Sequence, residues 1–281
     1  MKLSCSLWAL AALGLVACSS GEGDAQASAP DDQTITPLNE TSAEVSDSGS
    51  ANLDPIAASV EHPARPEDDT ARDADRKPGA TMRFAGIGKG ITVVELEAGG
   101  GYYTELISRA VGPNGKVYMQ NPPGFDGFLG DALETRLGGD RLPNVVVMRT
   151  NFDGLDAPAG SVDVVTWFQG PHELWFFPES TPEGFGDPAK SFDAIARVLK
   201  PGGALVVIDH RAADGAGPEV GGTLHRIEQS IVVDLAEAAG LALTKTSDIL
   251  AHPEDPLDIN VFDEAVRGST DQFLLYFEKP E

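Results

Sequence analysis

The stretch VVELEAGGGYYTE, residues 93–105, decides the fold of this chain. An apolar run with an acidic residue predicts a buried strand, and the tyrosines after the glycines begin a helix. Three consecutive glycines, Gly99, Gly100 and Gly101, lie between the two. Glycine lets a ligand approach the backbone closely, and a helix N-terminus offers free N–H groups. The loop is therefore predicted to cradle a ligand; a tight strand–helix turn without a ligand is the alternative.

Strand-like and helix-like segments alternate on both sides of this loop. The expected strands are 91–96, 116–120, 145–148, 162–168, 204–209, 241–246 and 273–278, and the expected helices are 66–76, 78–85, 102–111, 128–137, 188–199 and 224–239. Such alternation predicts an α/β fold, a doubly wound, mostly parallel seven-stranded sheet with helices on both faces. In such sheets ligands bind at the carboxyl ends of the strands.

The first 18 residues, MKLSCSLWALAALGLVAC, indicate export. Leu7–Val16 is apolar but shorter than the about 20 residues of a membrane-spanning helix, so residues 1–17 are interpreted as a signal peptide. The segment ending in Cys18 resembles the lipobox of bacterial lipoproteins. That resemblance implies a lipid anchor on Cys18, and Ser19 favours the outer membrane over the inner one. An ordinary signal peptide with a chance cysteine is the alternative.

The amino-acid composition divides residues 18–281 into two parts. Residues 18–61 are rich in Ser, Ala, Gly, Asp and Glu, and 19–61 contain no Lys, Arg or aromatic residue, so this part is expected to be a disordered tether. Residues 62–281 fit one domain of ordinary size. The net charge of −24 argues against nucleic acid as a partner, because such binding needs Lys and Arg to neutralise phosphates. The same charge argues against docking on anionic lipid.

Three motifs occur in a fixed order along the domain: VVELEAGGG (93–101), LDAPAGSVDVV (155–165) and RVLKPGGALVVID (197–209). Together they resemble the motifs of class I S-adenosylmethionine-dependent methyltransferases. GGGYYTE (99–105), DHRA (209–212) and LHRIEQS (224–230) more narrowly resemble a group of exported bacterial proteins described as predicted methyltransferases. The resemblance implies a Rossmann-like class I methyltransferase fold and S-adenosylmethionine as cofactor.

The resemblance also implies roles for single residues. Gly99, Gly100 and Gly101 correspond to the cofactor loop, and Glu95 takes the acidic place of the first motif. Glu97 stands where most members have a glycine that contacts the methionine end of the cofactor. It either crowds that site or pairs with the cofactor's amino group, since opposite charges attract strongly when partly buried.

Two further positions depart from the family pattern. Asn121 replaces the acidic residue that grips the ribose hydroxyls, and Asn151 falls where the family contacts the adenine amino group. Each asparagine keeps an acceptor but loses a charge, which costs on the order of 1 kcal/mol. Weakened cofactor binding is the expectation.

Histidines follow the expected strands on the acceptor side. His172 comes after the fourth strand and is the best candidate for a catalytic base or orienting group. His210 and His225 are expected on the same rim, although surface or ion-pairing roles are the alternative for each. A metal site of these three histidines is conceivable in chemical terms, since imidazoles suit zinc or copper. No short ligand spacing supports it, so no metal is expected.

Two functions remain open. The first is methyl transfer to a small molecule or an envelope component, by a lipid-anchored domain that faces the periplasm. The second is a non-catalytic module that binds a small ligand on the same fold. The glycine loop and the histidines favour the enzyme, and the altered contacts at Glu97, Asn121 and Asn151 favour the module. The sequence contains no G-x-S-x-G motif and gives no support for hydrolysis.

Overall fold

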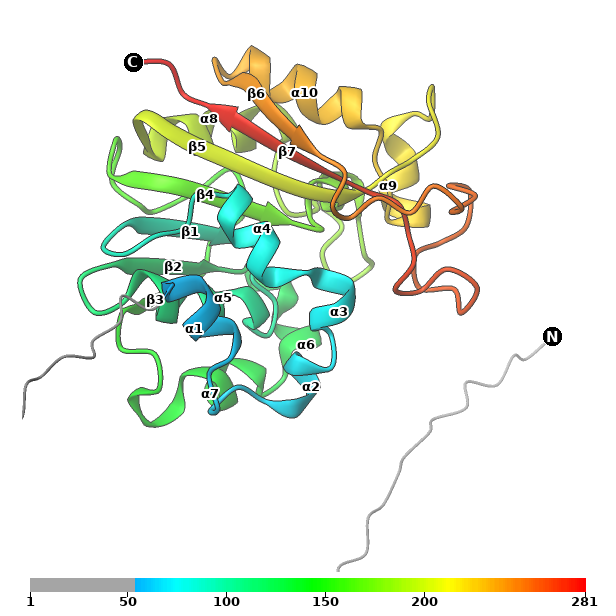
Figure 1. Cartoon of the computed structure of the whole chain (residues 1–281). Helices are drawn as coiled ribbons and strands as arrows, with labels where there is room; N and C mark the ends of the chain where they lie inside the picture. Colours follow the sequence, from blue (N-terminus) through cyan, green and yellow to red (C-terminus); the bar gives the residue numbers. More distant parts are fainter. Residues whose placement is uncertain (1–53) are drawn as a thin grey trace, which may run out of the picture. The chain divides into compact units, whose positions relative to one another are not determined.

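The structure is a computed structural model that describes residues 54–281. The signal peptide, Cys18 and most of the expected tether lie outside the described residues. The centre of the fold is a seven-stranded sheet with the strand order β3-β2-β1-β4-β5-β7-β6 (Figure 1). The strands are β1 Thr92–Leu96, β2 Lys116–Gln120, β3 Val145–Met148, β4 Val162–Phe168, β5 Leu199–His210, β6 Ala242–Ser247 and β7 Gln272–Glu278. β7 runs antiparallel to both neighbours and the other pairs are parallel, which confirms the predicted fold class.

Helices cover both faces of the sheet. On one face α1 (Pro55–Val60), α4 (Pro78–Phe84) and α5 (Tyr102–Val111) enclose a core that includes Val93 and Val206. On the other, α8 (Pro188–Val198) and α10 (Gln229–Ala238) enclose a core that includes Val94 and Val207. Successive strand residues point to opposite faces, and both faces are buried. The strands therefore read as continuous apolar runs.

The folded part begins earlier than the sequence analysis placed it. Helix α1 lies inside the expected tether, and its residues Ile56 and Ser59 are buried. The side chain of Asp54 caps the helix by accepting the N–H of Ile56 at 3.0 Å. The domain boundary at residue 62 is therefore wrong. The polar segment before it led to the wrong boundary, although α1 buries the apolar side chain of Ile56 against the core of α4 and α5.

Three expected helices differ from those of the structure. The segment 66–76 forms α2 (Glu67–Thr70) and α3 (Asp73–Arg76), and the segment 128–137 falls on α6 (Asp126–Leu129) and α7 (Ala132–Leu137). The expected helix 224–239 begins only at Gln229, as α10, after a break that follows α9 (Gly221–Leu224). The last break has a clear cause. The N–H of Ile227 donates to the carbonyl of His210 at 2.9 Å, and the N–H of Ala212 donates to the carbonyl of Ile227 at 2.9 Å. These residues leave the helix to pair with the end of β5.

Short 3₁₀ helices complete the fold: η1 Pro123–Phe125, η2 Gly138–Asp140, η3 Pro171–Trp175 and η4 Pro218–Val220. Beyond the carboxyl ends of the parallel strands lie α3, α9 and the orange segment before β7 (Figure 1). Within residues 54–281, no helix combines the length and apolar character needed to cross a membrane.

Candidate functional site

The glycine loop turns sharply after β1. Glu97, Gly99 and Gly101 all have left-handed backbone, with φ of 52°, 56° and 85°. A Cβ on Gly101 would lie 2.9 Å from Cγ of Arg136, so a glycine is required there. A Cβ on Gly99 would meet no other atom within 4 Å, because this residue borders a cavity. The loop is thus open to a ligand at Gly99 and packed against the protein at Gly101.

Asn121 holds this loop in place. Its Oδ1 accepts the N–H of Gly99 at 2.8 Å, and its Nδ2 donates to the Gly99 carbonyl at 3.1 Å. The side chain therefore positions the glycine loop, a role that the sequence analysis did not foresee. Asn151 is half-buried, and its carbonyl accepts the N–H of Gly154 at 3.1 Å. Contacts of Asn121 with ribose and of Asn151 with adenine stay predictions.

A cavity of about 290 Å³ opens over the loop. Four predicted cofactor residues line it, namely Glu95, Glu97, Gly99 and Gly100. The sequence analysis missed its charged lining from other elements: Asp69, Arg72, Arg76 and Arg136. The first three belong to the segment PEDDTARDADR (66–76), whose dense charge was the available signal.

These arginines are held by specific contacts. Arg76 donates from Nη2 to Gln169 Oε1 at 3.1 Å, and its guanidinium lies 4.7 Å from the ring centre of Tyr102. Arg136 donates from Nε to the Gly100 carbonyl at 2.9 Å. Its Nη1 lies 2.7 Å from Asp69 Oδ2 and 2.6 Å from Glu105 Oε2. The cavity therefore presents both positive and negative groups at fixed positions.

Glu95 is buried beneath the loop, where its carboxylate accepts a hydrogen bond from Thr104 Oγ1. Burial raises the pKa of Glu95 to about 8, against the opposing effects of Thr104 and Arg136. The side chain of Glu97 points toward β4, and its Oε2 accepts from Trp167 Nε1 at 3.1 Å. Burial and the neighbouring charge of Glu173 raise the pKa of Glu97 well above its ordinary value.

A second cavity of about 360 Å³ lies at the ends of β4, β5 and β7. Its lining includes apolar groups of Phe168, Ile208, Leu250 and Val261, together with His210. The two cavities share five lining residues: Arg72, Arg76, Tyr103, Phe168 and Gln169. The two cavities therefore adjoin and share part of their lining.

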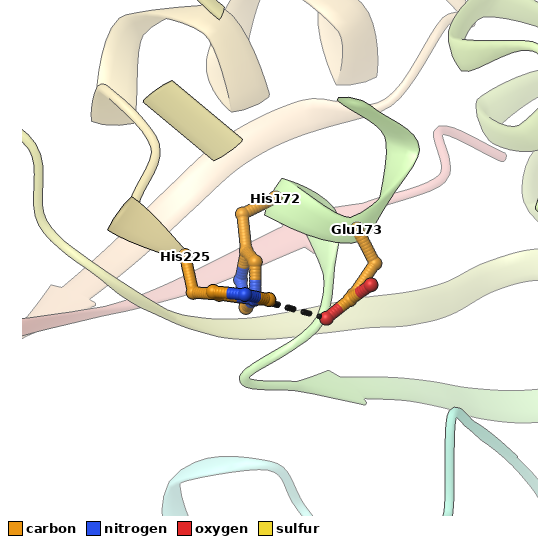
Figure 2. A group of neighbouring side chains, drawn as sticks. All are labelled: His172, Glu173 and His225. Carbon is orange, nitrogen blue, oxygen red and sulfur yellow. Dashed lines mark hydrogen bonds and ion pairs between the residues drawn. The ribbon is translucent and has the colours of Figure 1, made fainter. Parts of the chain in front are cut away.

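Beside this second cavity, two histidines and a glutamate converge (Figure 2). His225 Nδ1 lies 3.3 Å from His172 Nε2 and 3.3 Å from Glu173 Oε1. The distance between His172 Nε2 and Glu173 Oε1 is 3.4 Å. The structure thus brings His172 and His225 together, as the sequence predicted, and adds Glu173. That residue was missed because its partner His225 comes 52 positions later.

Asp209 fixes His172 from the other side. Its Oδ1 lies 2.7 Å from His172 Nδ1, and its Oδ2 accepts the backbone N–H of His172 at 2.8 Å. Burial disfavours the imidazolium, but Asp209 and Glu173 outweigh it and raise the pKa of His172 to about 10. Burial likewise disfavours the Glu173 carboxylate, yet hydrogen bonds to the two histidines lower its pKa to about 2. These neighbours thus stabilise the protonated form of His172.

His210 belongs to the second cavity and not to this cluster. Its Nδ1 pairs with Thr270 Oγ1 at 2.8 Å, and its ring centre lies 6.2 Å from that of His172. Burial and the positive charge of His172 lower the pKa of His210 well below its ordinary value. The three histidines therefore share one rim, but His210 stands apart from the other two.

Glycines allow the cluster to form. A Cβ on Gly221 would lie 2.5 Å from the His172 carbonyl oxygen, and one on Gly222 would lie 2.4 Å from that of Trp175. Helix α9 can therefore approach the backbone of η3 closely. His225 follows α9 in a left-handed conformation, with φ of 54°. The adjacent glycines Gly221 and Gly222 are the signal in the sequence for this approach.

Comparisons with known proteins agree with this architecture. No protein-family model matches the chain. The ubiquinone/menaquinone biosynthesis C-methyltransferase UbiE of Pasteurella multocida is 30% identical over 138 residues, which are 46% of this chain and 43% of that protein. UbiE of an Enterobacter species is 27% identical over 135 residues, 46% of each chain. The matched part thus spans less than half of these curated relatives.

Solved structures match over more of the chain. A SAM-dependent methyltransferase from Aquifex aeolicus has a TM-score of 0.51 and 19% identity, covering 74% of this chain and 98% of that one. Geranyl diphosphate methyltransferase in complex with SAM has a TM-score of 0.52 and 15% identity, covering 79% and 94%. The strand order, the antiparallel β7 and these matches lead to one conclusion: the chain has the fold of the class I S-adenosylmethionine-dependent methyltransferases.

Proposed function

We propose that this protein transfers a methyl group from S-adenosylmethionine to a small molecule or to a component of the cell envelope. The observation that carries the proposal is the pair of adjoining cavities with shared lining residues. Methyl transfer is an in-line displacement, which needs donor and acceptor held at neighbouring positions. The cavity over the glycine loop suits the donor, and the second cavity suits the acceptor.

The lining of the first cavity fits the methionine end of the cofactor. Asp69 offers a carboxylate for its amino group, and Glu97 offers a buried carboxyl that the positive charge of that amino group would favour in its ionised form. Arg72 and Arg76 offer cations for its carboxylate. Gly99 leaves room for the ligand to reach the backbone. When bound, S-adenosylmethionine supplies an electrophilic methyl group on its sulfonium. The UbiE relatives and the methyltransferases of the same fold support this choice of cofactor.

The second cavity supplies the acceptor side. Phe168, Ile208, Leu250 and Val261 give it apolar walls, which suit an acceptor with a hydrophobic body. An acceptor whose nucleophile carries a proton needs a base within reach. His210 lines this cavity and takes that role, whereas His172 is engaged with Asp209. The preferred base therefore moves from His172 to His210.

Calorimetric titration of the full-length protein with S-adenosylmethionine and its demethylated product tests the cofactor site. We expect micromolar binding that Gly99→Val abolishes. Gly160→Val is the matched control, because Gly160 has a similar φ of 63°, open space around a Cβ and a place before β4, at the other end of the sheet. Absence of binding at millimolar ligand, or equal effects of both variants, would reject the proposal.

A non-catalytic module that binds a small ligand is the second candidate. It is favoured by Asn121, whose amide bonds the loop, and by Glu97 in place of a glycine. Methyl-labelled cofactor incubated with the protein and an envelope extract distinguishes the two candidates. An enzyme gives labelled product that His210→Ala lowers strongly, whereas a binding module retains the cofactor without turnover.

We also propose a cellular location for the protein: a lipid anchor on Cys18 holds it to the outer membrane, with the domain facing the periplasm. The lipobox-like segment 15–18 and the apolar run before it support this placement. Cys18→Ser should release the protein from the membrane fraction into the soluble one. Recovery of both forms in the same fraction would count against the anchor.

A further inference from the structure

We propose that His172, Glu173 and His225 form a binding site for a divalent first-row transition metal of the zinc class, with one coordination position left open. The inference does not rest on the proposed methyl transfer, because it concerns a separate set of side chains. It revises the expectation from sequence that the site holds no metal. It also replaces the set of three histidines with two histidines and a carboxylate.

The spacing of the three ligand atoms is the first observation. Zinc binds imidazole nitrogen and carboxylate oxygen at about 2.1 Å, so neighbouring ligands of a tetrahedral site stand about 3.4 Å apart. The three distances between His172 Nε2, His225 Nδ1 and Glu173 Oε1 are 3.3, 3.3 and 3.4 Å. The atoms therefore form one face of a tetrahedron of the right size (Figure 2).

The chemistry of the donor set is the second observation. Two histidines and one carboxylate bind the metal in some catalytic zinc centres and in non-haem iron centres, where they leave coordination positions open for water or substrate. Calcium and magnesium prefer sites built from oxygen alone. Glu173 Oε2 is buried and has no hydrogen-bond partner among residues 54–281, so a second carboxylate oxygen also remains available. The set favours a transition metal.

The surroundings hold the ligands as a metal site requires. Asp209 binds His172 Nδ1 at 2.7 Å, which directs Nε2 toward the other two ligands. A carboxylate behind a ligating histidine is the usual arrangement in zinc proteins. The ring of His225 packs against Phe176 and Phe262, with ring centres 5.0 and 4.9 Å away. Both imidazoles are thus fixed before any ion arrives.

The site is enclosed but reachable. The side chains of His172, Glu173 and His225 are 5%, 11% and 13% exposed. Phe262 packs on His225 and also lines the second cavity, so the cluster borders that cavity. Three protein ligands leave the fourth position for water or for a polar group of a molecule bound there.

Zinc titration of the full-length, chelator-treated protein tests the site directly. We expect one equivalent of Zn²⁺ to bind with a dissociation constant of about 1 µM or below. His225→Ala and Glu173→Gln should each weaken binding by about 100-fold or more, since each removes one of three ligands. His210→Ala is the matched control, an imidazole on the same rim outside the cluster, and should keep the affinity.

Cobalt provides a second measurement, because the visible spectrum of bound Co²⁺ reports four-coordinate geometry. Glu173→Gln keeps the size of the side chain, and its circular dichroism spectrum shows whether it folds. Loss of both the tight zinc site and the cobalt spectrum in folded Glu173→Gln supports the proposal. Binding equal to that of the parent in both cluster variants, or loss in His210→Ala alone, overturns it, as does weak uptake of several ions by the acidic surface.

Discussion

Asp209 at the end of β5 binds His172 twice, through the imidazole Nδ1 at 2.7 Å and through the backbone N–H at 2.8 Å. The same carboxylate accepts the N–H of His210 at 2.8 Å. Its side chain is fully buried. One carboxylate therefore links the end of β5 to η3 and orients the histidine that is central to the cluster.

This relationship predicts a large cost for Asp209→Asn. The change places an amide N–H₂ against donors and leaves the buried pair incomplete, so the free energy of unfolding should fall by about 3 kcal/mol. Asp163→Asn is the control, because Asp163 also accepts a backbone N–H, from Thr92, and pairs with Lys200, but is 30% exposed. The free energy of unfolding of Asp163→Asn should fall by about 1 kcal/mol or less. Urea unfolding of the two variants measures the difference, and equal losses would contradict it.

Glu97 gives a prediction in which stability and binding change in opposite directions. Its left-handed backbone, with φ of 52°, strains a residue that has a Cβ. Glu97→Gly should relieve about 1–2 kcal/mol of this strain and raise the melting temperature. It should also weaken S-adenosylmethionine binding by about tenfold, because the cavity loses a carboxyl that can ionise beside the cofactor's amino group.

Glu97→Gln separates these effects, since it removes the ionisable carboxyl and keeps the strained backbone. We expect it to weaken binding without the gain in melting temperature. Calorimetry and thermal unfolding of both variants provide the measurement. Tighter binding by Glu97→Gly would instead show that the glutamate crowds the cofactor.

The sheet could be predicted from the sequence because its signals are local. The ranges 116–120, 145–148 and 162–168 are strands at the predicted residues, and 102–111 is a helix as predicted. The apolar runs reflect burial on both faces of a parallel sheet. Helix α1 escaped notice because it buries little apolar surface beyond Ile56. The break before α10 escaped notice because backbone pairing between Ile227 and His210 causes it.

The site residues likewise fall into those that a local motif predicts and those that only the folded chain brings together. Glu95, Glu97 and Gly99 were predicted because they lie within one motif that folds locally. Arg76 reaches Gln169 across 93 positions, and His225 reaches Glu173 across 52. Such contacts between distant residues depend on the folded topology, so they cannot be predicted from the spacing of residues within a motif. A search for short ligand spacings does not detect a metal site whose ligands come from two distant segments.

The buried carboxyl of Glu95 predicts that stability falls as pH rises. Burial raises the pKa of Glu95 in the folded protein to about 8, against an ordinary value of 4.5. Between these values the folded protein keeps a proton that the unfolded chain loses, so the free energy of unfolding decreases. Glu95→Gln removes this decrease of stability with pH. The effect of the substitution on the free energy of unfolding should therefore be more favourable at pH 8 than at pH 5, by on the order of 2 kcal/mol.

Glu105→Gln is the control of opposite sign. Burial disfavours the Glu105 carboxylate, but Arg109 and Arg136 outweigh it and lower its pKa. The stability from this group is present at neutral pH and is lost as pH falls through the lowered pKa. The variant should therefore be less stable than the parent at pH 7, with a smaller difference in acid. Parallel pH profiles for the two variants would contradict both assignments.

The close approach of α9 to η3 predicts that Gly221→Ala damages the cluster from a distance. A Cβ there would lie 2.5 Å from the carbonyl oxygen of His172, and backbone cannot move aside as a flexible side chain can. The free energy of unfolding should fall by about 1–3 kcal/mol. Zinc affinity should fall as well, because His225 directly follows α9.

Gly127→Ala serves as the control, since Gly127 also lies in a short helix and a Cβ there would meet no other atom within 4 Å. It should leave zinc binding unchanged and slightly raise stability, as alanine favours a helix more than glycine does. Zinc titration and thermal unfolding of the two variants measure both effects. If Gly221→Ala retained full zinc affinity, the packing of α9 on η3 would not be what positions His225.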